Sequence, residues 1–237
     1  MAAMDKTAPI CQAPPDIRNG FVTKVYSILT VQLFVTFAIG GFIRMSLTPQ
    51  SLGYYMPVFQ FANLVTLGTL LGVACCCSGA MRTFPYNYLI LGVITVGMAI
   101  TTGFLTVLYT APSILMAVGA TSFIFLGLTA YACLTKTDFT GMGPYLFAGC
   151  LALMAFGFGL QIASLFGIHA PFMHKVYLCV GLLLFTLYIV FDTQMIVGGE
   201  HKKHEFSIDD YAFAALNLYL DVINLFVMIL QLFGDRN

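Results

Sequence analysis

The sequence predicts an all-α membrane protein, a bundle of seven transmembrane helices. Composition is the first reason: of 237 residues, 59% are hydrophobic and only 8% are charged. A soluble protein of this size carries about a quarter charged residues, so lipid is the expected solvent for this chain. The second reason is that the apolar residues form continuous runs of about 20 residues, the length that crosses a hydrocarbon core. Such runs do not alternate, which argues against a β-barrel.

The apolar runs follow one another with short polar breaks. In order, the expected spans cover residues 24–44, 57–79, 86–109, 112–134, 144–166, 174–197 and 209–233. The breaks carry charged residues, glycines and prolines, among them Arg44, Pro85, Pro112, Pro144 and Pro171. Loops this short make neighbouring helices antiparallel.

The seventh run carries an acid, Asp221, near its middle, whereas Asp192 lies close to the end of the sixth run. We therefore expect six clear spans and a semi-hydrophobic C-terminal helix, which either crosses the membrane or enters and returns. Residues 1–20 are polar and contain several prolines, so they are predicted to form a disordered N-terminal tail. Residues 21–237 are predicted to form one transmembrane domain.

Basic residues are distributed unevenly between the two predicted sides of the membrane, and Lys and Arg favour the cytoplasm. The side of the N-terminus carries Lys6, Arg18, Lys24, Arg82, Lys136, Lys202 and Lys203. The other side carries Arg44, Lys175 and Arg236. The N-terminus is thus predicted to be cytoplasmic.

Two acids, Asp192 and Asp221, lie inside apolar runs. A carboxylate in the middle of a membrane costs about 2.5–3.5 kcal/mol on insertion scales, so it is expected to face the bundle interior and to have a partner. The polar loop 198–205 folds the last two spans into a hairpin, which lets the two acids approach.

The last span also has a polar face. Its members recur at helical spacing, and they are Asn217, Asp221, Asn224 and Gln231. A hydrogen-bond ladder that holds the bundle together is one interpretation. The other is a pathway for ions or protons, which gains weight because asparagine would serve packing at a lower desolvation cost than an acid.

Two neighbouring carboxyl groups in a medium of low dielectric constant cannot both ionise easily, so Asp192 and Asp221 are expected to share a proton and to titrate as a unit. Loss of that proton adds repulsion between the helices. It also leaves a site of hard oxygens suited to Ca²⁺. Arg82, near a helix end, is a candidate latch for the pair, and membrane anchoring is its alternative role.

The sequence contains none of the common enzyme motifs, such as GxSxG, HExxH or a phosphate-binding loop. We therefore predict a protein that is not an enzyme and that needs no cofactor, with Ca²⁺ only as a permeant or transiently bound ion. The formal net charge is zero, which gives no reason to expect nucleic-acid binding.

At the level of motifs, the chain resembles the transmembrane Bax-inhibitor-motif family, in its branch of lifeguard and Golgi anti-apoptotic proteins. The most specific motifs are Ser207-Ile208-Asp209-Asp210-Tyr211, Leu218-Tyr219-Leu220-Asp221-Val222-Ile223-Asn224-Leu225-Phe226 and Tyr188-Ile189-Val190-Phe191-Asp192-Thr193. Supporting motifs are Lys24-Val25-Tyr26-Ser27-Ile28-Leu29, Pro85-Tyr86-Asn87-Tyr88 and Gly143-Pro144-Tyr145-Leu146-Phe147.

The resemblance implies a seven-helix fold of the Bax-inhibitor type, with a central pore. It implies a passive, pH-sensitive Ca²⁺ leak from the endoplasmic reticulum or Golgi and suppression of cell death. It places the family's paired aspartates on Asp192 and Asp221 and its second-helix arginine on Arg82. A second-helix acid of the family has no counterpart in residues 57–79, where Asn63 is the nearest polar residue.

Two functions remain open at this level. One is a Ca²⁺-permeable leak channel gated by protonation of the Asp192–Asp221 pair. The other is a non-conducting regulator that controls death signalling through membrane partners, with cell-death regulators and Ca²⁺ release channels as the expected partner classes.

Overall fold

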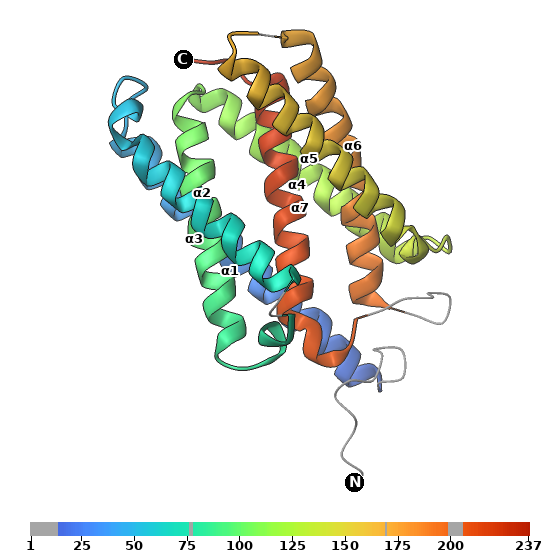
Figure 1. Cartoon of the computed structure of the whole chain (residues 1–237). Helices are drawn as coiled ribbons and strands as arrows, with labels where there is room; N and C mark the ends of the chain where they lie inside the picture. The colour runs from blue at the N-terminus through green and yellow to red at the C-terminus, as the bar shows by residue number, and fades with distance from the viewer. Residues whose placement is uncertain (1–13, 76–77, 169, 199–205) are drawn as a thin grey trace. The chain divides into compact units, whose positions relative to one another are not determined.

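The structure is a computed structural model that describes residues 14–75, 78–168, 170–198 and 206–237. Within these ranges the chain forms long α-helices, with short 3₁₀ helices in some of the connections between them (Figure 1). The elements are α1 (Pro15–Ser46), α2 (Leu52–Cys75), η2 (Ser78–Arg82), α3 (Tyr86–Val107), α4 (Ala111–Leu134), η3 (Thr140–Met142), α5 (Gly143–Leu165), α6 (Pro171–Val197), η4 (Ile208–Asp210) and α7 (Tyr211–Phe233). The seven α-helices of the described residues are all long and apolar enough to cross a membrane, which confirms the predicted fold class.

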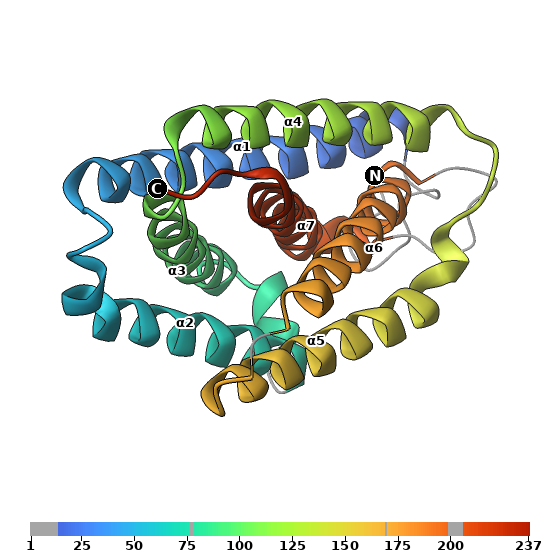
Figure 2. The same cartoon turned by 90° about the horizontal axis from the view of Figure 1, so that it is seen from above.

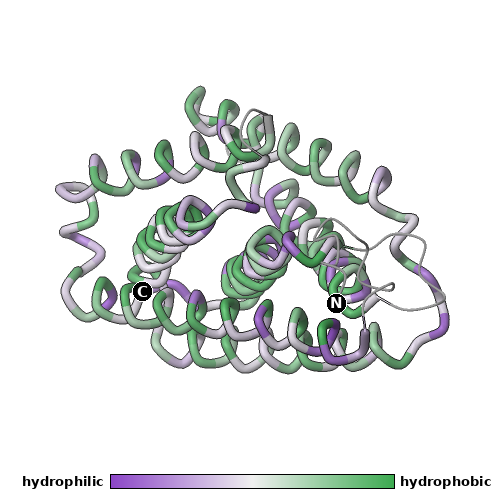
Figure 3. Tube along the Cα trace, turned by 90° about the horizontal axis from the view of Figure 1, so that it is seen from below, coloured by the Kyte–Doolittle hydropathy of each residue, from purple (hydrophilic) through white to green (hydrophobic). Residues whose placement is uncertain are grey.

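Coloured by hydropathy, the helices are predominantly apolar along their length (Figure 3). Large side chains such as Phe34, Phe123 and Leu165 are more than 70% exposed. In water this surface would drive aggregation, whereas in a bilayer it is the surface that lipid covers.

The first helix begins earlier than the apolar run that predicts it. Pro15 stands in its first turn, where the missing backbone N–H of proline costs nothing. Residues 15–20 are therefore helical, although they fall in the predicted tail. Residues 1–13 of that tail lie outside the described residues.

The chain falls into two compact units. The first contains the described residues up to Ala111, together with Phe206–Tyr219 and Asp235–Asn237. The second contains residues from Pro112 to the end of α6, together with Leu220–Gly234.

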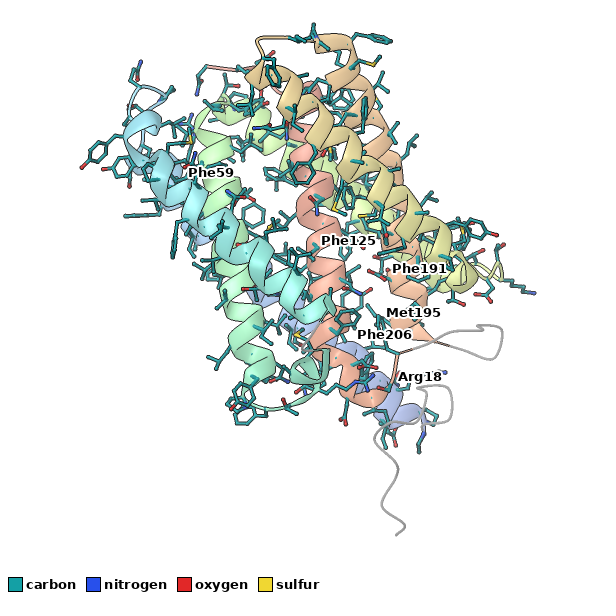
Figure 4. The ribbon with its side chains drawn as sticks, in the orientation of Figure 1. Arg18, Phe59, Phe125, Phe191, Met195 and Phe206 are labelled. Carbon is teal, nitrogen blue, oxygen red and sulfur yellow. The ribbon has the colours of Figure 1, made fainter. Side chains whose placement is uncertain are left out.

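In the first unit, α3 lies between α1 and α2 (Figure 2). Phe59 of α2, labelled in Figure 4, packs against Phe104 of α3 with ring centroids 5.4 Å apart. Buried hydrogen bonds add to this packing, because Gln32 of α1 donates to Thr95 of α3 at 2.9 Å. The hydroxyls of Thr36 on α1 and Tyr219 on α7 lie 2.8 Å apart. Such bonds are the usual polar links between helices in lipid.

Both ends of α7 are fixed to the two ends of α3. Just before α7, Asp210 pairs with Arg82, which precedes α3, with Nε and Oδ1 2.7 Å apart. After α7, the backbone N–H of Asn237 donates to Leu108 at 2.9 Å, directly beyond α3. The last helix therefore crosses the same thickness as α3 and does not turn back.

Glycine allows α1 and α3 to approach closely. A Cβ added to Gly103 of α3 would lie 3.1 Å from the Cα of Gly40 on α1 and 2.9 Å from Cδ1 of Ile43. Small residues at helix crossings of this kind let backbones touch in membranes.

We expect Gly103→Leu to lower the free energy of unfolding by about 1–3 kcal/mol, the usual cost of overpacking. Thermal unfolding of the purified protein in detergent measures it. Gly92→Leu is the matched control on the same helix, since a Cβ there would meet nothing within 4 Å. Equal midpoints for the two variants would contradict the close approach of α1 and α3.

Candidate functional site

The second unit brings Asp192 of α6 and Asp221 of α7 together. Their carboxyl groups lie close enough to interact with each other electrostatically. Asp192 is 2% exposed and Asp221 is 5% exposed, so neither side chain faces lipid. A hydrogen bond between two carboxyl groups needs a proton on one of them, because an ionised carboxylate can only accept.

A tyrosine and a thiol adjoin the acidic pair. Tyr188 lies one turn before Asp192 on α6, so the two side chains share a helix face. Its hydroxyl interacts electrostatically with both carboxyl groups and with the thiol of Cys150 on α5. Four ionisable side chains from three helices thus form one cluster within the second unit. The sequence analysis missed Tyr188 and Cys150, although the four-residue spacing of Tyr188 and Asp192 was a visible signal.

One oxygen of the pair is left without a partner. Oδ2 of Asp221 is buried and finds no hydrogen-bond donor among the described residues. An unpaired acceptor in a medium of low dielectric constant is costly, so this oxygen is available to a proton donor or a cation.

The polar face of α7 is placed as the spacing predicts, but its members differ in surroundings. Asp221 is buried, whereas Asn217, Asn224 and Gln231 are partly exposed. The amide of Asn224 donates to the carbonyl of Leu220, one turn back on the same helix, at 2.8 Å. That bond is within α7 and so is not a rung of an interhelical ladder.

Arg82 has a partner that the sequence analysis did not foresee. Its Nε and Nη2 donate to the two carboxylate oxygens of Asp210, at 2.7 and 3.2 Å. The hydrogen bond to Asp210 raises the pKa of Arg82 above its ordinary value. The Arg82 side chain is 52% exposed, so the pair contributes at most about 1 kcal/mol. Its contribution is geometric, since it fixes the start of α7 to the segment before α3.

Asn63, the nearest polar residue to the missing second-helix acid, hydrogen-bonds within the first unit. Its amide donates to the carbonyl of Phe59 at 2.9 Å, and its oxygen accepts from Thr101 at 3.3 Å. The side chain thus links α2 to α3.

A further buried amide, Gln194, lies two residues after Asp192. Its Oε1 accepts from the backbone N–H of Phe139 at 2.8 Å, and its Nε2 donates to the carbonyls of Thr137 and Ala132 at 2.9 and 3.4 Å. Gln194 therefore ties the end of α6 to the segment that follows α4. A glutamine inside an apolar run was the signal for it in the sequence.

The pair alone supplies few ligands for a metal ion. Among the described residues, no group of three or more histidine, cysteine or acidic side chains could hold a metal ion. Two carboxylates supply four oxygens, while Ca²⁺ takes about six to eight ligands. Binding by these side chains alone would accordingly be weak and reversible.

Taken with the seven spans, this cluster defines a polytopic helical membrane protein that carries a carboxyl pair inside the bilayer. Residues 18–237 match the family model described as "Inhibitor of apoptosis-promoting Bax1". The chain belongs to this family, which confirms the resemblance seen in its motifs.

Relatives with lifeguard names match nearly the whole chain. It is 31% identical to Protein lifeguard 3 of Homo sapiens over 231 residues, which cover 93% of this chain and 70% of the relative. The Mus musculus protein of the same name is 32% identical, with 93% and 71% covered. LIFEGUARD 2 of Arabidopsis thaliana is 35% identical over 228 residues, with 94% and 91% covered. The family description implies a membrane protein that opposes apoptosis.

Proposed function

We propose that this protein is a pH-sensitive Ca²⁺ leak channel of the Golgi or endoplasmic reticulum, in which Asp192 and Asp221 share a proton in the closed state. One observation supports the proposal above all others. Two buried carboxyl groups from successive helices lie close enough to interact with each other electrostatically. Stability alone would not require two acids at this depth, because neutral amides could pair there at lower cost.

The direction of the pH response follows from whether the Asp192–Asp221 pair holds a proton. At low pH one carboxyl group carries the proton and donates it to the other, which holds α6 and α7 together. As pH rises the proton is lost, and two negative charges in contact repel each other strongly in a medium of low dielectric constant. Separation of the helices then exposes carboxylate oxygens to Ca²⁺, so the leak increases with pH.

Suppression of cell death completes the proposal. A leak lowers the Ca²⁺ content of the store and so reduces the Ca²⁺ that a death signal can release. The family description and the lifeguard names of the relatives support this role. The protein would work in the lipid bilayer with a cytoplasmic N-terminus, with Ca²⁺ and protons as its ions. Cell-death regulators or Ca²⁺ release channels are the partners we propose.

The alternative is a non-conducting regulator that acts through those partners, with the acidic pair as a structural link between α6 and α7. The family description favours it in one respect, since that description speaks of inhibition and not of transport.

Reconstitution separates the two functions. Purified full-length protein in liposomes, with a Ca²⁺ indicator inside, should pass Ca²⁺ at a rate that rises from mildly acidic to mildly alkaline pH. Protein-free liposomes set the background. A Ca²⁺ flux equal to that background at every pH would overturn the channel and leave the regulator.

A further inference from the structure

Tyr219 lies on α7, two residues before Asp221, and is completely buried. Its hydroxyl oxygen is 2.8 Å from the hydroxyl oxygen of Thr36 on α1. The proton of the Thr36 hydroxyl is already donated to the backbone carbonyl of Gln32, at 2.8 Å. A threonine hydroxyl carries only one proton, so Tyr219 is the donor and Thr36 the acceptor. This bond joins α7 to α1 within the first unit.

The acceptor belongs to a buried hydrogen-bond network between α1 and α3. The side-chain amide of Gln32 donates to Thr95 at 2.9 Å, and Thr95 donates to the carbonyl of Leu91 at 2.7 Å. The side chains of Gln32, Thr36 and Thr95 are no more than 5% exposed. Inside a bilayer such groups have neither water nor lipid head groups as substitute partners. The network therefore holds the hydroxyl of Tyr219 in one position.

The hydrogen bond of Tyr219 also affects the direction of Asp221. Successive residues of an α-helix are about 100° apart, so the side chains of Tyr219 and Asp221 leave α7 in directions about 200° apart. A helix cannot turn about its axis at one residue without turning two residues further on. Tyr219 is the last residue of α7 that belongs to the first unit, and Asp221 belongs to the second. The bond to Thr36 thus determines where the carboxyl group of Asp221 points.

We propose that Tyr219 is a positioning residue for the acidic pair, because its hydrogen bond to Thr36 fixes the rotation of α7 and keeps Asp221 directed at Asp192. The part that this gives Tyr219 in gating rests on the proposed function. Among the described residues, the titratable groups that interact with Asp221 by charge are Asp192 and Tyr188 of α6 and Cys150 of α5. Tyr219 acts on the pair through the orientation of the helix.

Removing either end of the bond tests this role. Tyr219→Phe keeps the aromatic ring and loses the donor, whereas Thr36→Val loses the acceptor. Each substitution should let α7 turn and weaken the contact between the two acids, so that their shared proton is lost at lower pH. The pH of half-maximal Ca²⁺ leak from liposomes should fall by about half a unit to one unit, the equivalent of one hydrogen bond. The double variant should shift it no further, since both substitutions remove the same bond.

Two other variants control for the loss of a hydroxyl as such. The hydroxyl of Thr30 bonds to the carbonyl of Tyr26 within α1, and the side chain of Tyr54 on α2 is 82% exposed. Thr30→Val and Tyr54→Phe should keep the wild-type pH dependence. The same wild-type dependence in Tyr219→Phe or in Thr36→Val would overturn the proposal even if unfolding midpoints fell, because the bond would then serve stability alone.

Infrared difference spectroscopy separates this inference from the channel. It follows the carbonyl stretch of protonated carboxyl groups as the pH changes, and the signal lost in both Asp192→Asn and Asp221→Asn belongs to the pair. In Tyr219→Phe we expect that signal to titrate at lower pH than in the wild-type protein. This shift would establish the positioning role even if the wild-type protein passed no Ca²⁺ and the channel proposal failed. An unchanged titration would overturn the positioning role whether or not the protein conducts.

Discussion

Replacing Asp221 by asparagine is expected to abolish the pH dependence of the proposed Ca²⁺ leak and to hold the proposed channel closed. An amide does not ionise, and its N–H can donate to Asp192 at every pH. The link between α6 and α7 would then persist when Asp192 is charged. A hydrogen bond to a charged group contributes about 1.5–3 kcal/mol, so the alkaline leak should fall by about tenfold or more. Flux from reconstituted liposomes, measured across the pH range, tests this.

The matched control is Asp209→Asn. Asp209 precedes the same helix and lies outside the pair, so its loss should leave both the leak and its pH response unchanged. The reciprocal variant, Asp192→Asn, should reproduce the effect of Asp221→Asn, because either residue can be the acceptor. A wild-type pH profile in Asp221→Asn would remove the pair from the gating mechanism even if the protein conducts Ca²⁺.

The fold could be predicted almost completely because lipid imposes a simple rule on sequence. A run of about 20 apolar residues can only be a spanning helix, and prolines at the starts of α5 and α6 mark where helices begin. The start of α1 was harder to predict, because its first turns are polar and a hydropathy pattern does not mark polar residues as part of a spanning helix. Whether α7 spans could not be decided from Asp221 alone. The contacts of Arg82 and Asn237 decide it, and those contacts depend on the tertiary structure.

The site was predictable to the extent that it depends on local chain geometry. Asp192 and Asp221 lie on α6 and α7, which follow each other in the chain, so the order of the helices alone suggests that the two acids approach. The partner of Arg82 was not predictable, because Asp210 is 128 residues away in the sequence. Cys150 was not predictable for a similar reason, since nothing in an apolar run distinguishes a thiol that only packs from one that also interacts with Tyr188.

Gln194→Leu is expected to destabilise the second unit by about 3 kcal/mol. Gln194 is 1% exposed, and leucine has a similar size but no hydrogen-bonding atoms. The substitution would leave the N–H of Phe139 without its acceptor and two carbonyls without their donor, at about 1–3 kcal/mol for each buried group. The midpoint of thermal unfolding in detergent should fall by about 10 °C.

Gln161→Leu is the control for this substitution, because Gln161 is exposed on α5 and should change stability by no more than about 0.5 kcal/mol. A second measurement shows whether Gln194 also positions the acidic pair. The hydrogen bonds of Gln194 hold the end of α6 only two residues beyond Asp192. Their loss should therefore weaken the contact between Asp192 and Asp221. The proposed leak should then rise at acidic pH, where the wild-type channel is expected to be closed. Stability equal to that of Gln161→Leu would show that the hydrogen bonds of Gln194 are dispensable. Lower stability with an unchanged leak would confine its role to the fold.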